Sequence, residues 1–299
     1  MTDSARAIVG AKPRFRGGSL GAYIDLTKPR IIELLLITTV PSMVLAARGW
    51  PGTWLVLATL VGGVLSAGGA NALNSYLDRD IDRVMRRTAS RPLARDAVEP
   101  GKALVFGLTL GLTGFVWLAL TTTMLAAVIA TAALVFYVLV YTLTLKRTTV
   151  HNIVIGGAAG AAPTLVGWAA VSGSLGVPAW VLFFVVFYWT PPHFWALALR
   201  YRDDYARAGI PMLPVVAGEE ATTRRMLLYT GLMVGVSLLL VPLAAMGWIY
   251  LLAALGLGAW FLWDTWQVHR QPRLAMRLFT TSTVYLAALF AALLVDVML

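Results

Sequence analysis

Nine apolar stretches, each long enough to cross a lipid bilayer as a helix, follow one another along this chain of 299 residues. A transmembrane α-helix needs about 20 predominantly apolar residues. The stretches are rich in Leu, Ala, Val and Gly and lack the strict alternation of transmembrane β-strands. They cover residues 31–48, 54–74, 103–121, 124–145, 153–172, 178–198, 226–246, 248–265 and 279–298. We therefore predict an all-α, polytopic membrane bundle of nine transmembrane helices.

The composition supports a membrane protein and excludes several kinds of site. Hydrophobic residues make up 59% of the chain and charged residues 13%, against about 45–50% and 25% in soluble domains. The lipid bilayer must therefore cover part of the apolar surface. The absence of cysteine excludes disulfides and cysteine-ligated metals. A net charge of +10 suggests nucleic acid in a soluble protein, but here the placement of the charges explains it, and we expect no nucleic-acid partner.

The basic residues divide unequally between the two sides of the predicted bundle. Alternating the nine spans across the bilayer brings 23 of the 24 Lys and Arg to one side and leaves Arg48 on the other. Because cytoplasmic loops are enriched in Lys and Arg, we expect a cell-membrane protein with a cytoplasmic N-terminus and an external C-terminus. Residues 1–20 are expected to be a basic, disordered cytoplasmic tail without a secretory signal. Residues 21–299 are expected to form one transmembrane domain.

Three oxygen-bearing side chains lie at the predicted cytoplasmic end of the second span. Asn74, Asp78 and Asp82 are four residues apart, so on a helix they form one stripe, with Asp80 on the other side. Such oxygen ligands suit a hard cation, and Mg²⁺ typically takes one or two carboxylates together with substrate phosphate and water. The stripe therefore predicts a magnesium–diphosphate site that faces the cytoplasm.

This stripe also needs a positive counter-charge. Like charges four residues apart on a helix repel each other. Arg79, Arg83 and Arg87 form a neighbouring stripe that could supply the cation between the two aspartates. The alternative interpretation is a solvated helix end with a mixed-charge cap.

A second group of candidate residues follows the fourth span. Lys146 and Arg147 stand at a predicted membrane–water boundary, where they could hold diphosphate oxygens or simply anchor the span. The small residues of Gly156–Pro163 either admit a flat or bulky ligand or allow close helix packing. Both alternatives remain open at this point.

The third group lies at the end of the sixth span. Pro191 and Pro192 should break or kink the helix. His193, Arg200 and Asp204 then share one helix face. His193 either makes a hydrogen bond between helices or acts in proton transfer or as an iron ligand of a metalloporphyrin. The segment that follows, Gly209–Pro214, is either a lid over the site or an ordinary connector.

These segments together resemble the UbiA-type intramembrane prenyltransferases, and within them the branch that farnesylates haem. The resemblance rests on the aspartate motif of residues 74–82 with Arg87-Thr88 and Arg91-Pro92. The remaining matching segments, in the same order along residues 20–220, are 27–36, 141–147, 152–163, 192–195, 203–205 and 210–214. The combination is specific to that branch.

The resemblance implies a function and a set of partners. The enzyme would transfer a farnesyl group from farnesyl diphosphate to a vinyl group of haem B. Water addition would give haem O for haem-copper oxidase assembly, with haem A synthase as an acceptor of the product. The cofactor would be Mg²⁺, with Asn74, Asp78 and Asp82 binding its diphosphate complex and Lys146 and Arg147 acting with them in catalysis.

The resemblance also implies substrate contacts. The implied substrate-binding residues are Arg30, Arg83, Tyr141, His193, Arg200, Asp203 and Asp204. Quinone-type members carry a second aspartate motif on the sixth span, where this chain has His193 and Arg200. This departure favours a haem acceptor and leaves a second Mg²⁺ open.

Two competing functions remain. One is a UbiA-type prenyltransferase of quinone or chlorophyll synthesis. The other is a transporter or channel, which predicts paired half-helices and charges near the middle of the membrane. Because the charges of this chain gather at one face, the sequence favours the enzyme.

Overall fold

The computed structural model describes residues 19–299, and for residues 30–36 it describes the backbone alone. Helices account for the fold, and no strand occurs among the described residues. The long elements are α2 (Pro29–Ala47), α3 (Thr53–Leu77), α5 (Pro100–Thr121), α6 (Met124–Val135) with the π-helix η2 (Phe136–Leu145), α8 (Asn152–Ser172), α9 (Val177–Arg200), α12 (Gly218–Leu238), α14 (Trp248–Arg270) and α15 (Ala275–Met298). The prediction of an all-α membrane bundle is confirmed.

The number of spans agrees approximately with the prediction. Eight helices in the described part of the chain are long and apolar enough to cross a membrane. The remaining predicted span, residues 31–48, corresponds to α2, whose apolar part Ile37–Ala47 is shorter than the other eight. The observed bounds lie within a few residues of the predicted ones for most helices, because each apolar stretch is closed by polar or glycine-containing turns.

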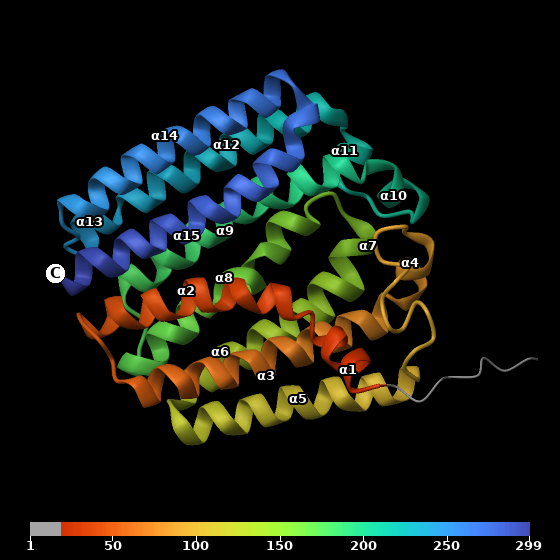
Figure 1. The fold of residues 1–299 in the computed structure, drawn as a ribbon, viewed down its shortest axis with the longest axis horizontal. Helices are drawn as coiled ribbons and strands as arrows, with labels where there is room; N and C mark the ends of the chain where they lie inside the picture. Colours follow the sequence, from red (N-terminus) through yellow and green to blue (C-terminus); the bar gives the residue numbers. More distant parts are fainter. Residues whose placement is uncertain (1–18) are drawn as a thin grey trace, which may run out of the picture.

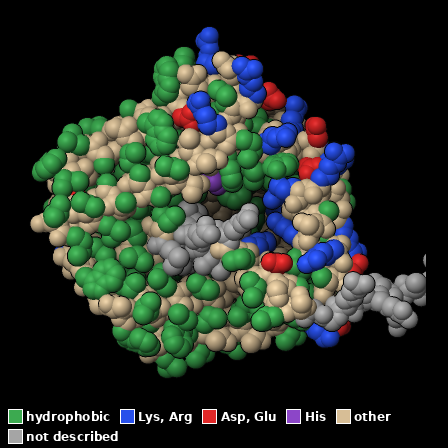
Figure 2. All heavy atoms as spheres, viewed as in Figure 1, with side chains coloured by type: hydrophobic (Ala, Val, Ile, Leu, Met, Phe, Trp, Pro, Cys, Tyr) green, Lys and Arg blue, Asp and Glu red, His purple; other side chains and the backbone are tan. Residues whose placement is uncertain are grey.

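Five short helices belong to the part of the bundle where the charged residues also lie. They are α1 (Leu20–Thr27), α4 (Arg79–Val84), α7 (Lys146–Thr148), α10 (Arg202–Arg207) and α11 (Leu213–Val216). In Figure 1, α4, α7, α10 and α11 occupy the end opposite the C-terminus. Figure 2 shows Lys, Arg, Asp and Glu gathered at that end, while apolar side chains cover the rest of this face. We call the end formed by these four helices the basic end.

The long helices form two groups that run side by side. In Figure 1, α9, α12, α14 and α15 lie above, α3, α5 and α6 lie below, and α2 and α8 lie between them. The backbones of α3 and α5 approach each other closely, and a Cβ added to Gly69 would stand 2.7 Å from the backbone nitrogen of Gly111. Only glycine permits this backbone contact, which membrane helices use to maximise packing.

A hollow opens between the two groups beside the basic end (Figure 2). One histidine side chain is visible at its inner wall. The hollow borders the elements that carry the candidate residues of the sequence analysis.

Two features of the helices differ from the predictions. Of the two outcomes expected at Pro191-Pro192, a break is wrong, because α9 runs from Val177 to Arg200 through both prolines, and a kink stays a prediction. Both prolines are buried, and packing against neighbouring helices allows a membrane helix to continue through proline. In addition, α12 begins at Gly218 rather than near residue 226, because a polar helical segment precedes its apolar stretch.

Candidate active site

The predicted stripe of oxygen ligands is formed at the junction of α3 and α4. The backbone nitrogen of Asp78 donates to the Asn74 carbonyl at 2.9 Å, and that of Asp82 donates to the Asp78 carbonyl at 2.8 Å. Helical hydrogen bonding therefore continues through the junction, and the three residues lie one turn apart. All three are buried, with exposed fractions of 3% for Asn74, 0% for Asp78 and 2% for Asp82.

Asn74 and Asp78 are joined to two lysines from distant parts of the chain. The Asn74 amide nitrogen donates to Asp78 Oδ2 at 2.8 Å and to the Thr142 hydroxyl at 3.0 Å. Lys146 Nζ donates to the same Asp78 Oδ2 at 2.5 Å, and Lys28 Nζ donates to Asn74 Oδ1 at 2.5 Å. The network therefore brings α3, η2 with α7, and the α1–α2 junction to one point.

Asp82 is held by Arg91 from the loop after α4. One guanidinium nitrogen of Arg91 lies 2.8 and 2.9 Å from the two carboxylate oxygens. Arg83 instead forms an exposed ion pair with Asp96, and Arg79 lies over the ring of its neighbour Tyr76. The counter-charge thus comes from Lys146 and Arg91, and not from the stripe of Arg79, Arg83 and Arg87.

Arg147, the next residue after Lys146, contacts the same junction through Asp80. Its guanidinium donates to both carboxylate oxygens of Asp80 at 2.8 Å and to the Leu77 carbonyl at 3.0 Å. It is also 3.9 Å from Asp78 Oδ1. The hydrogen bond from Arg147 lowers the pKa of Asp80 to about 2. Two consecutive residues therefore bind the α3–α4 junction. Lys146 pairs with the buried Asp78, and Arg147 pairs with the exposed Asp80.

A surface cavity lies beside this outer ion pair. Its volume is about 310 Å³. Its lining residues are Asp80, Ile81, Val84, Arg147, Arg207, Ala208, Gly209 and Ile210. Ile210 and Met212 are each only 2% exposed, so the segment interpreted as either a lid or a connector is packed into the protein and forms one wall of the cavity.

Lys28 occupies an unusual position at the edge of the site. Burial lowers the pKa of its ammonium group to about 7, and the nearby charges of Arg91 and Lys146 act in the same direction. Asp82 and Asp78 oppose this effect. An anion bound beside Lys28 would favour its charged form, because opposite charges at close range stabilise each other.

Tyr141 lies in η2, where it packs against the glycine-rich start of α8. Its ring stacks on that of Tyr137 with 5.4 Å between centroids. A Cβ added to Gly156 would lie 2.3 Å from Tyr141 Cδ2. The small-residue segment is therefore explained by close helix packing at this position.

His193 of α9 lies between two aromatic rings. The centroid of Trp189 is 4.2 Å away and that of Phe279 is 4.3 Å away. His193 Nδ1 is 2.6 Å from the hydroxyl of Ser282 on α15. The interhelical hydrogen bond foreseen as one interpretation is thus present.

After α9 come two consecutive aspartates, Asp203 and Asp204, and the second of them is bonded to arginine residues. Asp203 is exposed, as is Arg200. Asp204 is buried, accepts from the Arg87 backbone nitrogen at 3.2 Å and pairs with Arg207.

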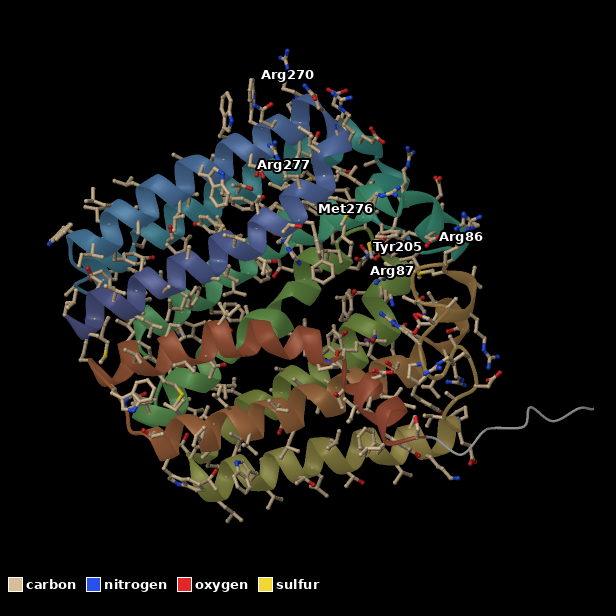
Figure 3. The ribbon with its side chains drawn as sticks, viewed as in Figure 1. Arg86, Arg87, Tyr205, Arg270, Met276 and Arg277 are labelled. Carbon is tan, nitrogen blue, oxygen red and sulfur yellow. The ribbon has the colours of Figure 1, made fainter. Side chains whose placement is uncertain are left out.

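Arg87 joins this pair of aspartates to the loop after α4. It also donates to the Tyr205 hydroxyl at 3.4 Å, and Figure 3 shows the two residues side by side, with Arg86 at the outer edge. Both Asp204 oxygens are therefore engaged by protein groups.

The donors on α3 and α4 fit Mg²⁺ bound through a diphosphate. Asp78 Oδ1 is buried and has no hydrogen-bond partner among the described residues. Within the described part of the chain, no group of three or more His, Cys, Asp or Glu could hold a metal unaided. Mg²⁺ usually takes one or two carboxylates and completes its shell with substrate phosphates and water. Asn74, Asp78 and Asp82 match that requirement.

Several residues of this network were not singled out from the sequence. They are Lys28, Arg91, Thr142 and Ser282, of which Arg91 appeared only as part of the motif that carries the family resemblance. Arg91 had a signal, because it follows the aspartate motif closely. Lys28 did not, because its backbone takes the left-handed conformation at φ 54°, which costs a non-glycine residue about 1–2 kcal/mol. Two predicted features, the side chain of Arg30 and the tail before residue 19, lie outside the described residues.

The family comparison matches most of the chain. Residues 35–286 match the model of the UbiA prenyltransferase family. The chain is 56% identical over 286 residues to protoheme IX farnesyltransferase 1 of Saccharopolyspora erythraea, an alignment that covers 94% of this chain and 91% of that protein. It is 50% identical over 301 residues to protoheme IX farnesyltransferase of Mycolicibacterium smegmatis, covering 99% and 97% respectively.

Solved structures share the fold at low sequence identity. A digeranylgeranylglyceryl phosphate synthase superposes with a TM-score of 0.77 at 19% identity, over 93% of this chain and 98% of that one. A UbiA homologue from Archaeoglobus fulgidus, solved with DMAPP and Mg²⁺ bound, gives a TM-score of 0.69 at 15% identity, over 91% and 99%. These similarities confirm the arrangement of the helices.

Proposed function

The chain belongs to the UbiA prenyltransferase family, and we propose that it transfers a farnesyl group from farnesyl diphosphate to a vinyl group of haem B. The observation that carries the proposal is the identity of 50–56% to protoheme IX farnesyltransferases over more than nine-tenths of the chain. The buried stripe of Asn74, Asp78 and Asp82 supports it, because a diphosphate leaving group requires such a site. The presence of His193 and Arg200 on α9, in place of the second aspartate motif expected of quinone-type members, also supports a haem acceptor.

The residues of the stripe would hold the diphosphate through Mg²⁺. When bound, Mg²⁺ supplies positive charge that stabilises the departing diphosphate. Asn74, Asp78 and Asp82 provide its protein oxygens, with Asp78 Oδ1 open to a ligand. Lys146, already 2.5 Å from Asp78 Oδ2, is close enough to turn its ammonium group toward a bound phosphate oxygen.

Other cations complete the electrostatic environment of the leaving group. Lys28 and Arg91 border the stripe through Asn74 and Asp82. Charges fixed before the reaction stabilise developing negative charge without reorganisation. Arg147 and Arg83 stand further out, engaged by Asp80 and Asp96, and would contribute mainly when substrate attracts them inward.

The apolar helices would keep water away from the allylic cation. Ionisation of farnesyl diphosphate leaves a delocalised carbocation that bulk water would capture. Tyr137 and Tyr141 stand on η2 beside the stripe, with their rings stacked on each other. These uncharged rings would form part of the wall around the allylic cation. On the acceptor side, His193 and the aromatic rings around it would contact the macrocycle.

We further propose how the reaction is placed in the cell. The basic end faces the cytoplasm of the cell membrane, because basic residues are retained there. Water adds after farnesyl transfer to give haem O, and haem A synthase is an acceptor of that product. These details extend beyond the family relationship and each needs its own test.

The direct test is product analysis with the purified protein. Protein in detergent or nanodiscs is incubated with haem B, farnesyl diphosphate and Mg²⁺, and the haems are separated and weighed by mass spectrometry. A farnesylated, hydrated haem is expected, and chelation of Mg²⁺ should abolish its formation. Prenylation of an aromatic acid with no change in haem would contradict the proposal.

A further inference from the structure

The imidazole of His193 is fixed in orientation by its neighbours. Trp189, one turn earlier on α9, covers one face at an interplanar angle of 20°. Phe279 of α15 covers the other face at 26°. Because both faces are stacked, the ring cannot rotate without displacing an aromatic side chain, and only its edges remain available for polar contacts.

The hydrogen bonds of Ser282 determine which ring nitrogen carries the proton. The Ser282 hydroxyl donates to the Phe279 carbonyl at 2.7 Å. A hydroxyl has a single proton, so toward His193 Nδ1, at 2.6 Å, Ser282 Oγ can only accept. Nδ1 is therefore the protonated nitrogen, and in neutral imidazole Nε2 then carries the lone pair.

Ser282 is itself held rigidly in place. It is fully buried, and its backbone carbonyl accepts a hydrogen bond from Trp189 Nε1 at 2.8 Å. One serine on α15 therefore orients two consecutive aromatic residues of the same α9 face. This double contact gives it a defined position relative to His193.

The second ring nitrogen of His193 has the character of a metal ligand. The hydrogen bond between the imidazole and Ser282 is made at Nδ1 and not at Nε2, and His193 is 9% exposed. A histidine that ligates a metal almost always donates its other ring N–H to a fixed partner, which sets the tautomer. No group of three or more His, Cys, Asp or Glu able to hold a metal occurs among the described residues, so the protein offers this metal a single nitrogen.

A metal that needs only one protein ligand must bring the others with it. A porphyrin supplies four nitrogens to its iron, and an axial histidine completes the bond to protein. We propose that Ser282 is a positioning residue that presents His193 Nε2 to the iron of the haem substrate. The proposal rests on the proposed function and adds to it the residue that sets the tautomer.

Haem titration without farnesyl diphosphate tests the proposal independently of turnover. Loss of such an outer partner typically weakens metal binding about 10–100-fold. Ser282→Ala should therefore weaken haem binding by about 10-fold and change the iron absorption bands, and His193→Ala should abolish the histidine-ligated spectrum. Thr280→Ala is the matched control, because Thr280 is an exposed hydroxyl on the same helix that bonds only within its own helix.

Kinetics then separate positioning from general damage. Ser282→Ala should raise KM for haem and leave KM for farnesyl diphosphate unchanged, and Ser282→Thr should restore haem binding. Unchanged haem binding in Ser282→Ala, or a wild-type spectrum in His193→Ala, would overturn the proposal. Equal losses toward both substrates would also overturn it, because they would indicate a structural role alone.

The tautomer can be observed directly. Protein labelled with ¹⁵N-histidine contains three histidines, and the His193 signal is assigned from its loss in His193→Ala. We expect a protonated Nδ1 and an unprotonated Nε2 in the haem-free protein, and a mixture of tautomers in Ser282→Ala. A protonated Nε2 in the wild type would refute the assignment. Haem ligation without any farnesylated product would instead contradict the proposed function.

Discussion

Asp78 is the residue at which the charges of the site converge. It is wholly buried and lies 2.5 Å from Lys146 Nζ and 3.9 Å from the Arg147 guanidinium. Removing one partner of a buried ion pair destabilises a protein by about 3–5 kcal/mol, since the other charge loses its compensation. A useful substitution must therefore keep the shape and hydrogen bonding of Asp78 while removing its charge.

Asp78→Asn is expected to lower kcat at least about 100-fold, because preorganised charge near a leaving group contributes on that scale. Farnesyl transfer to haem is measured together with the thermal unfolding midpoint in detergent. Glu219→Gln, an exposed carboxylate at the start of α12, is the control and should keep full activity. Wild-type turnover in Asp78→Asn would show that the stripe does not hold the diphosphate.

Lys146 and Arg147 provide a comparison between consecutive residues. Lys146 reaches the buried Asp78, whereas Arg147 pairs with Asp80, whose side chain is 60% exposed. Lys146→Gln should therefore reduce kcat at least about 100-fold, and Arg147→Gln about 10-fold or less, since exposed pairs contribute little. Initial rates at saturating substrates measure both, and an equal loss in the two variants would contradict this division of roles.

The sequence predicted the stripe but not its counter-charges. Spacing by four fixes which side chains share a helix face, so Asn74, Asp78 and Asp82 could be grouped without a structure. Their partners depend on how distant segments meet. Lys28 reaches Asn74 because its backbone is left-handed, and Arg91 reaches Asp82 from a loop, and neither geometry has a periodic signature.

At the scale of secondary structure, the contact between η2 and α8 positions Lys146. Gly156→Ala would place a methyl group against the Tyr141 ring, and overpacking of this kind costs about 1–3 kcal/mol. We expect a lower thermal midpoint and reduced kcat, because η2 leads directly into Lys146. Gly160→Ala is the control on the same helix, since a Cβ there meets nothing within 4 Å. Equal stability of both variants would contradict this packing argument.

Helix positions were predictable because each apolar stretch has to cross the bilayer. The π-helix was not, because the prediction assumed 3.6 residues per turn. The Lys146 backbone nitrogen bonds to the Tyr141 carbonyl, five residues earlier, which is the π pattern and changes the direction of every following side chain. The continuity of α9 through its two prolines was also missed, because it depends on burial by neighbouring helices.

At the scale of the whole molecule, charged side chains and apolar surface are separated, and this separation places the site at the boundary between membrane and water. The charged side chains gather at the basic end (Figure 2), where the stripe and the acidic cluster of α10 also lie. Arg270 and Arg277 of α14 and α15 extend this end along the upper group of helices (Figure 3). A diphosphate could therefore enter from water while its apolar chain stays among the helices.

The orientation of the bundle can be tested by cysteine labelling, for which this chain is suited because it contains no cysteine. Ser90 and Ser174 are both exposed, and the positive-inside rule assigns Ser90, in the basic loop after α4, to the cytoplasm and Ser174 to the outside. A membrane-impermeant maleimide should label Ser174→Cys in intact cells and Ser90→Cys only in inverted vesicles. Both variants should retain farnesyl transfer, since neither serine belongs to the site. The reverse labelling pattern would place the diphosphate site outside the cell, where neither substrate is expected. Labelling of both residues from one side would mean that the number of spans between them is even, contrary to the predicted topology.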